Sequence, residues 1–264
     1  MGWPDKTTFD SRTSISTTEF TGLYTYHGTI EKVCRYLKGI NFKGQVNIPA
    51  GTFTFTSSSV LKNLDTTGIY LRGASKTTTI INMPDEIYNC NLQIGLARLD
   101  SGVPVIWLSK IIHMDGNSTT ACVWSGRVTL NQSVMEADSS TFEDGLYVTY
   151  ASNAHVDKAL IWCSSADSIA LLVDQASYVS WEGNGGVISN PNAYGSSVGV
   201  SVGTGSTVLG DFGSKIGAIG QTIDTGVSVA QDSRYIGPPT FAGTVTTQYS
   251  QTVNVRTNDG IIFA

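Results

Sequence analysis

The stretch GVSVGTGS (residues 199–206) is followed by GVSVAQDS (residues 226–233), and the second copy nearly repeats the first. Two looser copies precede them: LYVTYAS ends at Ser152, and ALLVDQAS ends at Ser177. The serines that end the four copies are separated by 25, 29 and 27 residues. A recurrent period in this range is the signature of a repeat architecture.

Apolar residues recur at two positions in each copy, six and four residues before the serine. The first set contains Leu146, Leu171, Val200 and Val227, the second contains Val148, Val173, Val202 and Val229, and between them lie Tyr147, Leu172, Ser201 and Ser228. Apolar residues two apart indicate a strand with one face buried. A fifth copy is expected in TVNVRTND, with Val255 in the place of Val229 and Asp259 in the place of the serine.

The segments between the copies contain GNGG, NPN and PP, which are turn sequences, and no helical stripe of useful length. A period near 25 residues with strand patterning excludes propeller blades, which need about 40 residues, and the leucine-rich pattern is absent. We therefore predict an all-β fold, a right-handed parallel β-helix in which each coil contains two or three short strands. Successive coils would stack at about 4.8 Å, with roughly seven or eight coils in all.

Low charge is the main feature of the composition. Only 14% of the 264 residues are charged, and 28 residues are glycine. So few charges on a β protein favour an oligomer that hides its sheet edges and part of its surface.

The sequence also argues against several classes of protein. The net charge is −5 and no run of Lys or Arg exceeds two residues, so no nucleic-acid partner is expected. No apolar run is long enough to insert in a membrane, and the opening MGWPDKTTFD lacks the features of a signal peptide, so we expect synthesis in the cytoplasm. The cysteines Cys34, Cys90, Cys122 and Cys163 are far apart and are expected to be buried free thiols.

The two ends of the chain differ from the middle. In GTIEKVCRYLKG (residues 28–39) apolar residues have helical spacing, which predicts a short helix covering the first coil. We expect residues 1–27, rich in Thr and Ser, to be a lead segment without a core pattern, and residues 28–264 to hold the capping helix and the β-helix. The C-terminal sequence NDGIIFA is expected to leave the last coil uncapped.

Two neighbouring stretches carry a family resemblance: VNIPAGTFTFTSSSVLKN (residues 46–63) and GIYLRGASKTTTIINM (residues 68–83). They resemble the opening coils of the pectate-lyase-like β-helix superfamily, especially bacteriophage tailspikes and tail fibres. The resemblance implies a homotrimer in the tail of the virion, whose N-terminal segment attaches to a tail or baseplate protein. It also implies a shaft that binds or cleaves surface polysaccharide of the host.

Three carboxylates take the same place in successive copies, five residues after the serine: Asp157, Glu182 and Asp211. If the coils keep their register, neighbouring carboxylates would lie about 5 Å apart and the outer two about 10 Å apart. These separations approach those of glycosidase carboxylate pairs, and mutual repulsion would raise one pKa as a general acid requires. The same ladder could instead bind Ca²⁺ or be solvated.

Three further residues are candidates for contact with carbohydrate: Trp162, Trp181 and His155. Aromatic faces suit the apolar faces of sugar rings, although both tryptophans also fit a core position. A loop at residues 136–144 contains Glu136, Asp138, Glu143 and Asp144, which could coordinate Ca²⁺ or be solvated. No established metal-binding or cofactor-binding motif occurs.

These observations leave two main hypotheses. The favoured one is a trimeric, non-catalytic tail protein that attaches the phage to host glycan, because the chain is short for an enzymatic tailspike. The alternative is a polysaccharide depolymerase, a glycoside hydrolase rather than a lyase, since no Arg aligns with the carboxylates. A secreted pectin-type enzyme is disfavoured by the absent signal peptide.

Overall fold

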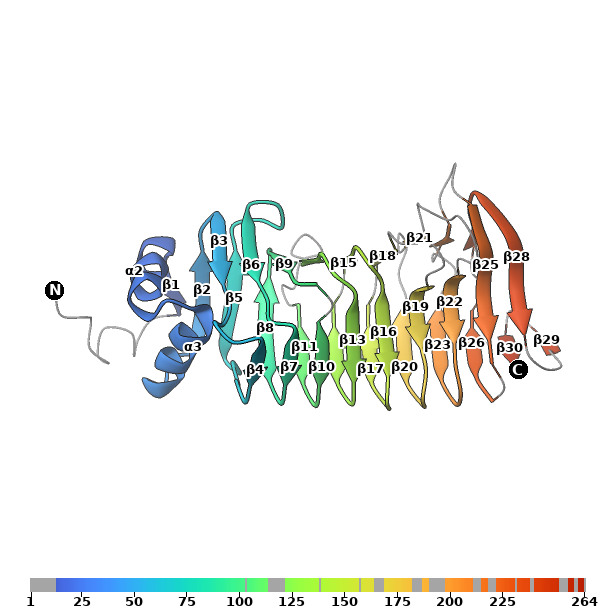
Figure 1. Ribbon diagram of the computed structural model, residues 1–264, viewed down its shortest axis with the longest axis horizontal. Helices are drawn as coiled ribbons and strands as arrows, with labels where there is room; N and C mark the ends of the chain where they lie inside the picture. Colours follow the sequence, from blue (N-terminus) through green and yellow to red (C-terminus); the bar gives the residue numbers. More distant parts are fainter. Residues whose placement is uncertain are drawn as a thin grey trace.

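The chain forms three parallel sheets that wind around one core. The computed structural model describes residues 13–102, 104–113, 122–137, 139–156, 158–163, 169–181, 187–189, 198–210, 215–217, 222–230, 232–237, 240–251, 256–258 and 261–263. Figure 1 shows the coils stacked along one axis, with the helices at the N-terminal end. This arrangement confirms the predicted right-handed parallel β-helix.

Sheet A has twelve strands in the described residues, and sheets B and C have nine each. Sheet A contains, in order, β1 (Ser14–Ile15), β2 (Gly44–Ile48), β5 (Ile69–Gly73), β8 (Asn91–Gly95), β11 (Lys110–Ile112), β14 (Val134–Glu136), β17 (Asn153–His155), β20 (Tyr178–Trp181), β23 (Thr207–Gly210), β26 (Arg234–Ile236), β30 (Ile261–Phe263) and β29 (Arg256–Asn258). Sheet B contains β3 (Gly51–Thr54), β6 (Thr79–Asn82), β9 (Arg98–Asp100), β12 (Val123–Trp124), β15 (Thr141–Phe142), β18 (Leu160–Trp162), β21 (Val187–Ser189), β24 (Lys215–Ile216) and β27 (Thr240–Phe241). Sheet C contains β4 (Val60–Lys62), β7 (Glu86–Tyr88), β10 (Val105–Trp107), β13 (Val128–Asn131), β16 (Leu146–Thr149), β19 (Ile169–Val173), β22 (Val198–Val202), β25 (Thr222–Val229) and β28 (Thr244–Gln251).

Each coil contributes one strand to each sheet, so the described residues form nine coils rather than the seven or eight predicted. The prediction was low because it applied the period of the C-terminal copies to the whole chain. Equivalent residues in the earlier coils are only 19 residues apart in two places, Cys90 to Ser109 and Ser133 to Ser152.

The registers test the predicted stacking of the repeats directly. Leu146 pairs with Leu171, Leu171 with Val200, and Val200 with Val227, as predicted, and the second apolar set pairs in the same way. The predicted fifth copy is wrong, because Val229 pairs with Gln251 in β28 and not with Val255, which lies outside the described residues. The last coil is shorter than the predicted period, so the sequence alignment overshoots it.

The serines that mark the repeat form a buried ladder at the corner between sheets C and A. Each hydroxyl accepts a hydrogen bond from the backbone N–H of the equivalent residue in the preceding coil. The donor–acceptor pairs are Cys90–Ser109 at 2.9 Å, Ser109–Ser133 at 3.1 Å, Ser133–Ser152 at 3.1 Å, Ser152–Ser177 at 3.2 Å and Ser177–Ser206 at 3.1 Å. These serines are at most 5% exposed. At this corner the chain turns, and no strand carbonyl accepts the backbone N–H. The serine hydroxyl accepts it instead, so that no buried N–H is left without an acceptor.

The residue before each ladder position has a left-handed backbone conformation, and the chain turns there from sheet C into sheet A. The set is Asn63, Asn89, Leu108, Gln132, Ala151, Ala176, Gly205 and Asp232, with φ between 47° and 67°. Residues with side chains other than Asn and Asp rarely adopt this conformation. The repeated corner therefore depends on the tertiary structure around it and on the serine that follows. We call this edge of the molecule the ladder corner.

The two copies quoted first offer a matched test of the serine ladder. Ser206 is 1% exposed and accepts the N–H of Ser177, whereas Ser201 lies on the outer side of β22 and is partly exposed. Ser206→Ala is expected to lower the free energy of unfolding by about 1–3 kcal/mol, because it leaves a buried N–H without an acceptor. Ser201→Ala should change it by less than about 0.5 kcal/mol. Urea denaturation followed by circular dichroism measures both; equal effects would contradict a structural role for the ladder.

The N-terminal helix predicted for residues 28–39 is present as α3 (Ile30–Gly39) and covers the exposed edge of the first coil. Arg35 donates from Nη2 to the carbonyl of Lys62 at 2.8 Å and from Nη1 to the carbonyl of Asn63 at 3.3 Å. The Glu31 N–H donates to the carbonyl of Phe55 at 2.8 Å. The Arg35 bonds occupy carbonyls at the edge of sheet C, and the Glu31 bond occupies a carbonyl directly after β3 of sheet B, where an additional strand could otherwise pair.

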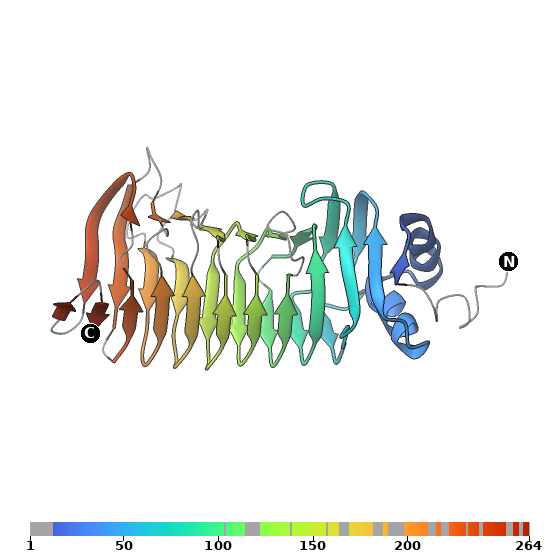
Figure 2. The ribbon, with the colours of Figure 1, turned by 180° about the vertical axis from the view of Figure 1, so that it is seen from behind.

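The expectation that residues 1–27 lack a core pattern is wrong for the described part of that segment. β1 pairs with β2, and α2 (Thr17–His27) packs on the first coil (Figure 2). α2 begins with a capping box between Ser16 and Glu19, which the Thr-rich sequence obscured. Its Phe20 is fully buried, and the Tyr24 hydroxyl accepts the Thr54 N–H at 2.8 Å. All three strands of the first coil are therefore covered.

The C-terminal end of sheet A is also covered, contrary to the expectation of an uncapped last coil. β30 pairs antiparallel with β26, and β29 pairs antiparallel with β30. A reversal of direction ends the coiling, because a further coil would need a parallel strand at that edge. Neither helix of the described part of the chain is long and apolar enough to cross a membrane.

Candidate functional site

The three carboxylates proposed from the repeat, Asp157, Glu182 and Asp211, lie outside the described residues. The strands that precede them are described, and they keep the register on which the hypothesis depends. His155 on β17 pairs with Ser180 on β20, which pairs with Leu209 on β23. The carboxylate ladder therefore stays a prediction, with its preceding strands aligned as the sequence comparison assumed.

The two tryptophans proposed to contact carbohydrate lie in different surroundings. Trp181, at the end of β20, is 0% exposed and belongs to the core, so its ring has no face available to a ligand. Trp162, at the end of β18 in sheet B, is 38% exposed and remains accessible. The two residues belong to different sheets, so they do not form one site.

His155 lies in a shallow depression on the outer face of sheet A. The depression has a volume of about 320 Å³, and its floor and rim come from β14, β17 and β20. The residues that line it are Val134, Met135, Glu136, Asn153, Ala154, His155, Tyr178 and Ser180. Tyr178 is 37% exposed, and His155 and Asn153 are also exposed. We call it the sheet A depression.

The strand registers explain how these side chains come together. Val134, Asn153 and Tyr178 pair across the three strands in one outward row. Glu136, His155 and Ser180 form a second row two residues further on, in which Ser180 is largely buried. Because parallel strands lie about 4.8 Å apart, the two rows make a regular surface of mixed polar and apolar groups with one aromatic ring at its edge. Such a surface can donate and accept hydrogen bonds and can stack on a sugar ring.

The acidic segment expected to be a single loop is divided between two faces. Glu136 lies on sheet A and pairs with Lys110 at 2.9 Å, with both side chains nearly half exposed. Glu143 instead accepts two bonds from Arg98 on β9, at 2.7 and 3.0 Å, and this hydrogen bonding raises the pKa of Arg98. Asp138 lies outside the described residues. Among the described residues, no group of three or more His, Cys, Asp or Glu side chains could hold a metal ion.

The four cysteines are buried and free, as predicted. Burial raises the pKa of both Cys34 and Cys122 to about 12. Thiols with such pKa values remain protonated at neutral pH, so neither cysteine is suited to nucleophilic chemistry.

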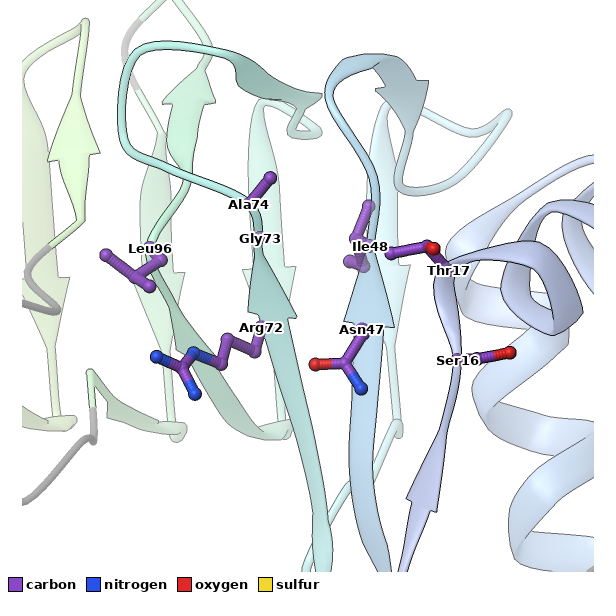
Figure 3. Close-up of a pocket in the computed structure, with 8 residues that line it drawn as sticks. All are labelled: Ser16, Thr17, Asn47, Ile48, Arg72, Gly73, Ala74 and Leu96. Carbon is purple, nitrogen blue, oxygen red and sulfur yellow. The ribbon is translucent and has the colours of Figure 1, made fainter.

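A second hollow, of about 420 Å³, lies between the start of α2 and strands β2, β5 and β8. Figure 3 shows Asn47 and Arg72 on neighbouring strands, with Ser16 and Thr17 on the opposite side. The Asn47 amide donates to the carbonyl of Ile15 at 2.8 Å and accepts from Gln45 at 2.6 Å. The N–H and the hydroxyl of Ser16 both donate to the Glu19 carboxylate. Ser16 and Asn47 are therefore already hydrogen-bonded within the protein, and their bonds hold β1 and α2 on the first coil.

His155 is a candidate from its sequence pattern, whereas Tyr178, which supplies the aromatic surface of the sheet A depression, was not predicted. A signal was present, because Tyr178 directly follows the ladder serine Ser177 and therefore begins an outward row. The alternation of the strand then places Val179 in the core and leaves Tyr178 outside.

No protein-family model matches the sequence, and no curated protein matches it. Two solved structures from Azotobacter vinelandii are similar in outline. The mannuronan C-5 epimerase AlgE4 A-module has a TM-score of 0.21 at 12% identity, covering 94% of this chain and 97% of its own. The AlgE6 A-module has a TM-score of 0.25 at 11% identity, covering 94% of this chain and 95% of its own. The fold assignment rests on the strand registers of this chain, and no activity is transferred from these proteins.

Proposed function

We propose that this chain is a structural protein of a bacteriophage tail, a tailspike or tail fibre, that attaches the virion to surface polysaccharide of its host. The observation that carries the proposal is the sheet A depression, where one aromatic ring and several polar side chains, among them Asn153 and His155, lie on a rigid face. The resemblance of residues 46–83 to tailspike openings supports the same role. In this proposal the protein is a homotrimer.

The two ends of the chain have separate roles in the proposed virion. Residues 1–27 attach the protein to a tail or baseplate protein. The shaft presents sheet A to the glycan. Coils that each pair with both neighbours hold the binding rows in fixed positions, so little ordering is required when the glycan binds.

The alternative is a depolymerase in which Asp157, Glu182 and Asp211 cleave the bound glycan. The observation that favours it is the register of β17, β20 and β23, which aligns the residues preceding all three carboxylates. The two functions share the binding surface and differ only in product. Purified polysaccharides should therefore be incubated with the protein and assayed for new reducing ends and for unsaturated sugars.

The depression itself is tested by Tyr178→Ala. Loss of the ring removes a stacking contact, and we expect the dissociation constant for a bound polysaccharide to rise by about three- to tenfold. Affinity electrophoresis on gels containing bacterial O-antigen or capsular polysaccharide measures the change. Tyr26→Ala removes an exposed tyrosine on α2, at the N-terminal end and away from β14, β17 and β20, and is the control. Absence of binding by the unmodified protein to every polysaccharide tested would overturn the attachment role.

A further inference from the structure

A groove runs along the ladder corner beside the sheet A depression. It has a volume of about 610 Å³ and reaches from the first coils to Gln132 and Val134. Val134 also lines the depression, so the two hollows lie next to each other. The residues that line the groove are Asn63, Asp65, Thr67, Asn89, Cys90, Asn91, Leu108, Ser109, Lys110, Gln132 and Val134. We call it the corner groove.

Amide side chains dominate the exposed part of the corner groove. Asn63, Asn89 and Gln132 are exposed, and each occupies the left-handed position of its coil, while the exposed Leu108 takes this position in the coil between Asn89 and Gln132. The repeated backbone turn therefore presents side chains in the same place on successive coils. Asn89 donates from Nδ2 to Asn63 Oδ1 at 2.7 Å, which fixes the orientation of both amides. Amides that are oriented in this way can bind hydroxyl and acetamido groups, since each offers both donors and an acceptor.

Three aromatic side chains stand next to the ladder corner on the side of sheet C, each directly before a left-handed corner residue, and Tyr88 is the one that precedes a groove amide, Asn89. Tyr88 pairs in register with Trp107, and Trp107 contacts Tyr150 with the ring centroids 5.9 Å apart. Tyr88 is 38% exposed and Tyr150 is 51% exposed. We call Tyr88, Trp107 and Tyr150 the aromatic strip. Three rings beside a row of amides provide stacking surfaces together with hydrogen-bonding groups, the combination that an extended carbohydrate uses.

The charges at the corner groove are already paired. Lys110 forms an ion pair with Glu136 at 2.9 Å, and Asp65 forms one with Lys38 at 3.1 Å. Asp65 also accepts bonds from Thr67, and this hydrogen bonding is the largest cause of its lowered pKa. A strongly charged ligand would have to compete with these pairs. The groove is therefore suited to a ligand without net charge.

We propose that the corner groove binds a neutral, extended stretch of polysaccharide, whose sugar rings stack on the aromatic strip and whose hydroxyl or acetamido groups bond to Asn63, Asn89 and Gln132. The inference rests on the proposed attachment role. It gives the protein a second glycan-binding surface, which is longer than the sheet A depression. The strand spacing of about 4.8 Å is close to the length of one pyranose unit along a chain. The glycan lies along the coil axis and continues into the sheet A depression at Val134.

The experiment uses the full chain and an array of purified bacterial O-antigen and capsular polysaccharides, both neutral and acidic. Trp107→Ala is expected to weaken binding to a neutral polysaccharide by about tenfold or more, and Trp107→Phe by much less, because a ring is retained. Asn89→Ala tests the amides independently and should weaken binding by about fivefold. Tyr26→Ala is the control for an exposed aromatic side chain elsewhere. Circular dichroism and thermal unfolding establish that each variant is folded.

Each outcome decides between the inference and the function on which it rests. Binding that depends on Tyr178 but not on Trp107 or Asn89 would overturn the corner groove and leave the attachment role standing. Binding only to acidic polysaccharides would overturn the neutral ligand. Binding of the unmodified protein to none of the polysaccharides would overturn both. Loss of neutral binding in Trp107→Ala and Asn89→Ala, with Tyr26→Ala unchanged, supports the inference.

Discussion

Replacing Phe20 with alanine is expected to lower the free energy of unfolding by about 3–5 kcal/mol. Phe20 is 0% exposed, and its ring lies 5.4 Å from that of Phe53 and 5.8 Å from that of Tyr24. The substitution leaves a cavity between α2 and the first coil. It also weakens the packing of α2 over the edge of β3. The exposed strand edges should then associate, and light scattering should show a higher molecular mass. Urea denaturation followed by circular dichroism measures the stability.

Tyr26→Ala provides the control on the same helix. Tyr26 is 67% exposed, so its loss should change the free energy of unfolding by no more than about 0.5 kcal/mol. Equal stability of Phe20→Ala and Tyr26→Ala would mean that α2 contributes nothing to the fold, and the described packing of residues 14–27 would then be wrong.

The second large effect is a loss of stability in mild acid caused by His113. Burial lowers the pKa of His113 from 6.5 to about 4. The indole of Trp124 donates to His113 Nε2 at 2.9 Å, so Nδ1 carries the proton and donates to the carbonyl of Ile94 at 3.1 Å. A second proton would have to occupy Nε2, where the Trp124 N–H already points. The folded chain therefore keeps this imidazole neutral.

The sign of the effect follows from proton uptake. Above pH 6.5 the imidazole is neutral in both states and contributes no pH dependence. As the pH falls from 6.5 to about 4, the unfolded chain binds a proton that the folded chain does not, and stability decreases by about 1.4 kcal/mol per pH unit. The total loss is about 3 kcal/mol and levels off below the folded pKa.

His113→Gln is the matched variant for this prediction. A glutamine amide can donate to the Ile94 carbonyl and accept from the Trp124 indole, yet it does not titrate. Urea denaturation at several pH values between 7 and about 4 should show a shallower decline for the variant than for the unmodified protein. Parallel declines would show that carboxylates, and not His113, account for the acid sensitivity.

The sequence predicted the fold well where its repeats were clear. Pairs such as Val200 and Val227 are apolar, inward and regularly spaced, so alignment of the copies gave the observed register. The same alignment failed at Val255, because the last coil is shorter and the chain then reverses direction. α2 was missed because its helical character depends on a capping box and on packing against Phe53, not on a strong apolar stripe.

The candidate binding surfaces were less accessible to prediction. His155 was a candidate from the sequence and lies exposed on β17, but the partners that complete its depression come from other coils. The aromatic strip was missed although Tyr88, Trp107 and Tyr150 each stand two residues before a ladder position. The copies before Leu146 are looser and irregularly spaced, so the sequence does not reveal their equivalent positions.

The serine ladder has a consequence for how the chain can change over evolutionary time. Its bonds link residues 19, 24, 19, 25 and 29 positions apart without a break in register. Coils of different length therefore differ in the part of the chain that runs from sheet A through sheet B to sheet C, away from the ladder corner. Insertions and deletions in those segments can accumulate while the corner stays aligned. A lineage of such proteins can thus vary one side of the shaft and keep the spacing of the groups along its other edge.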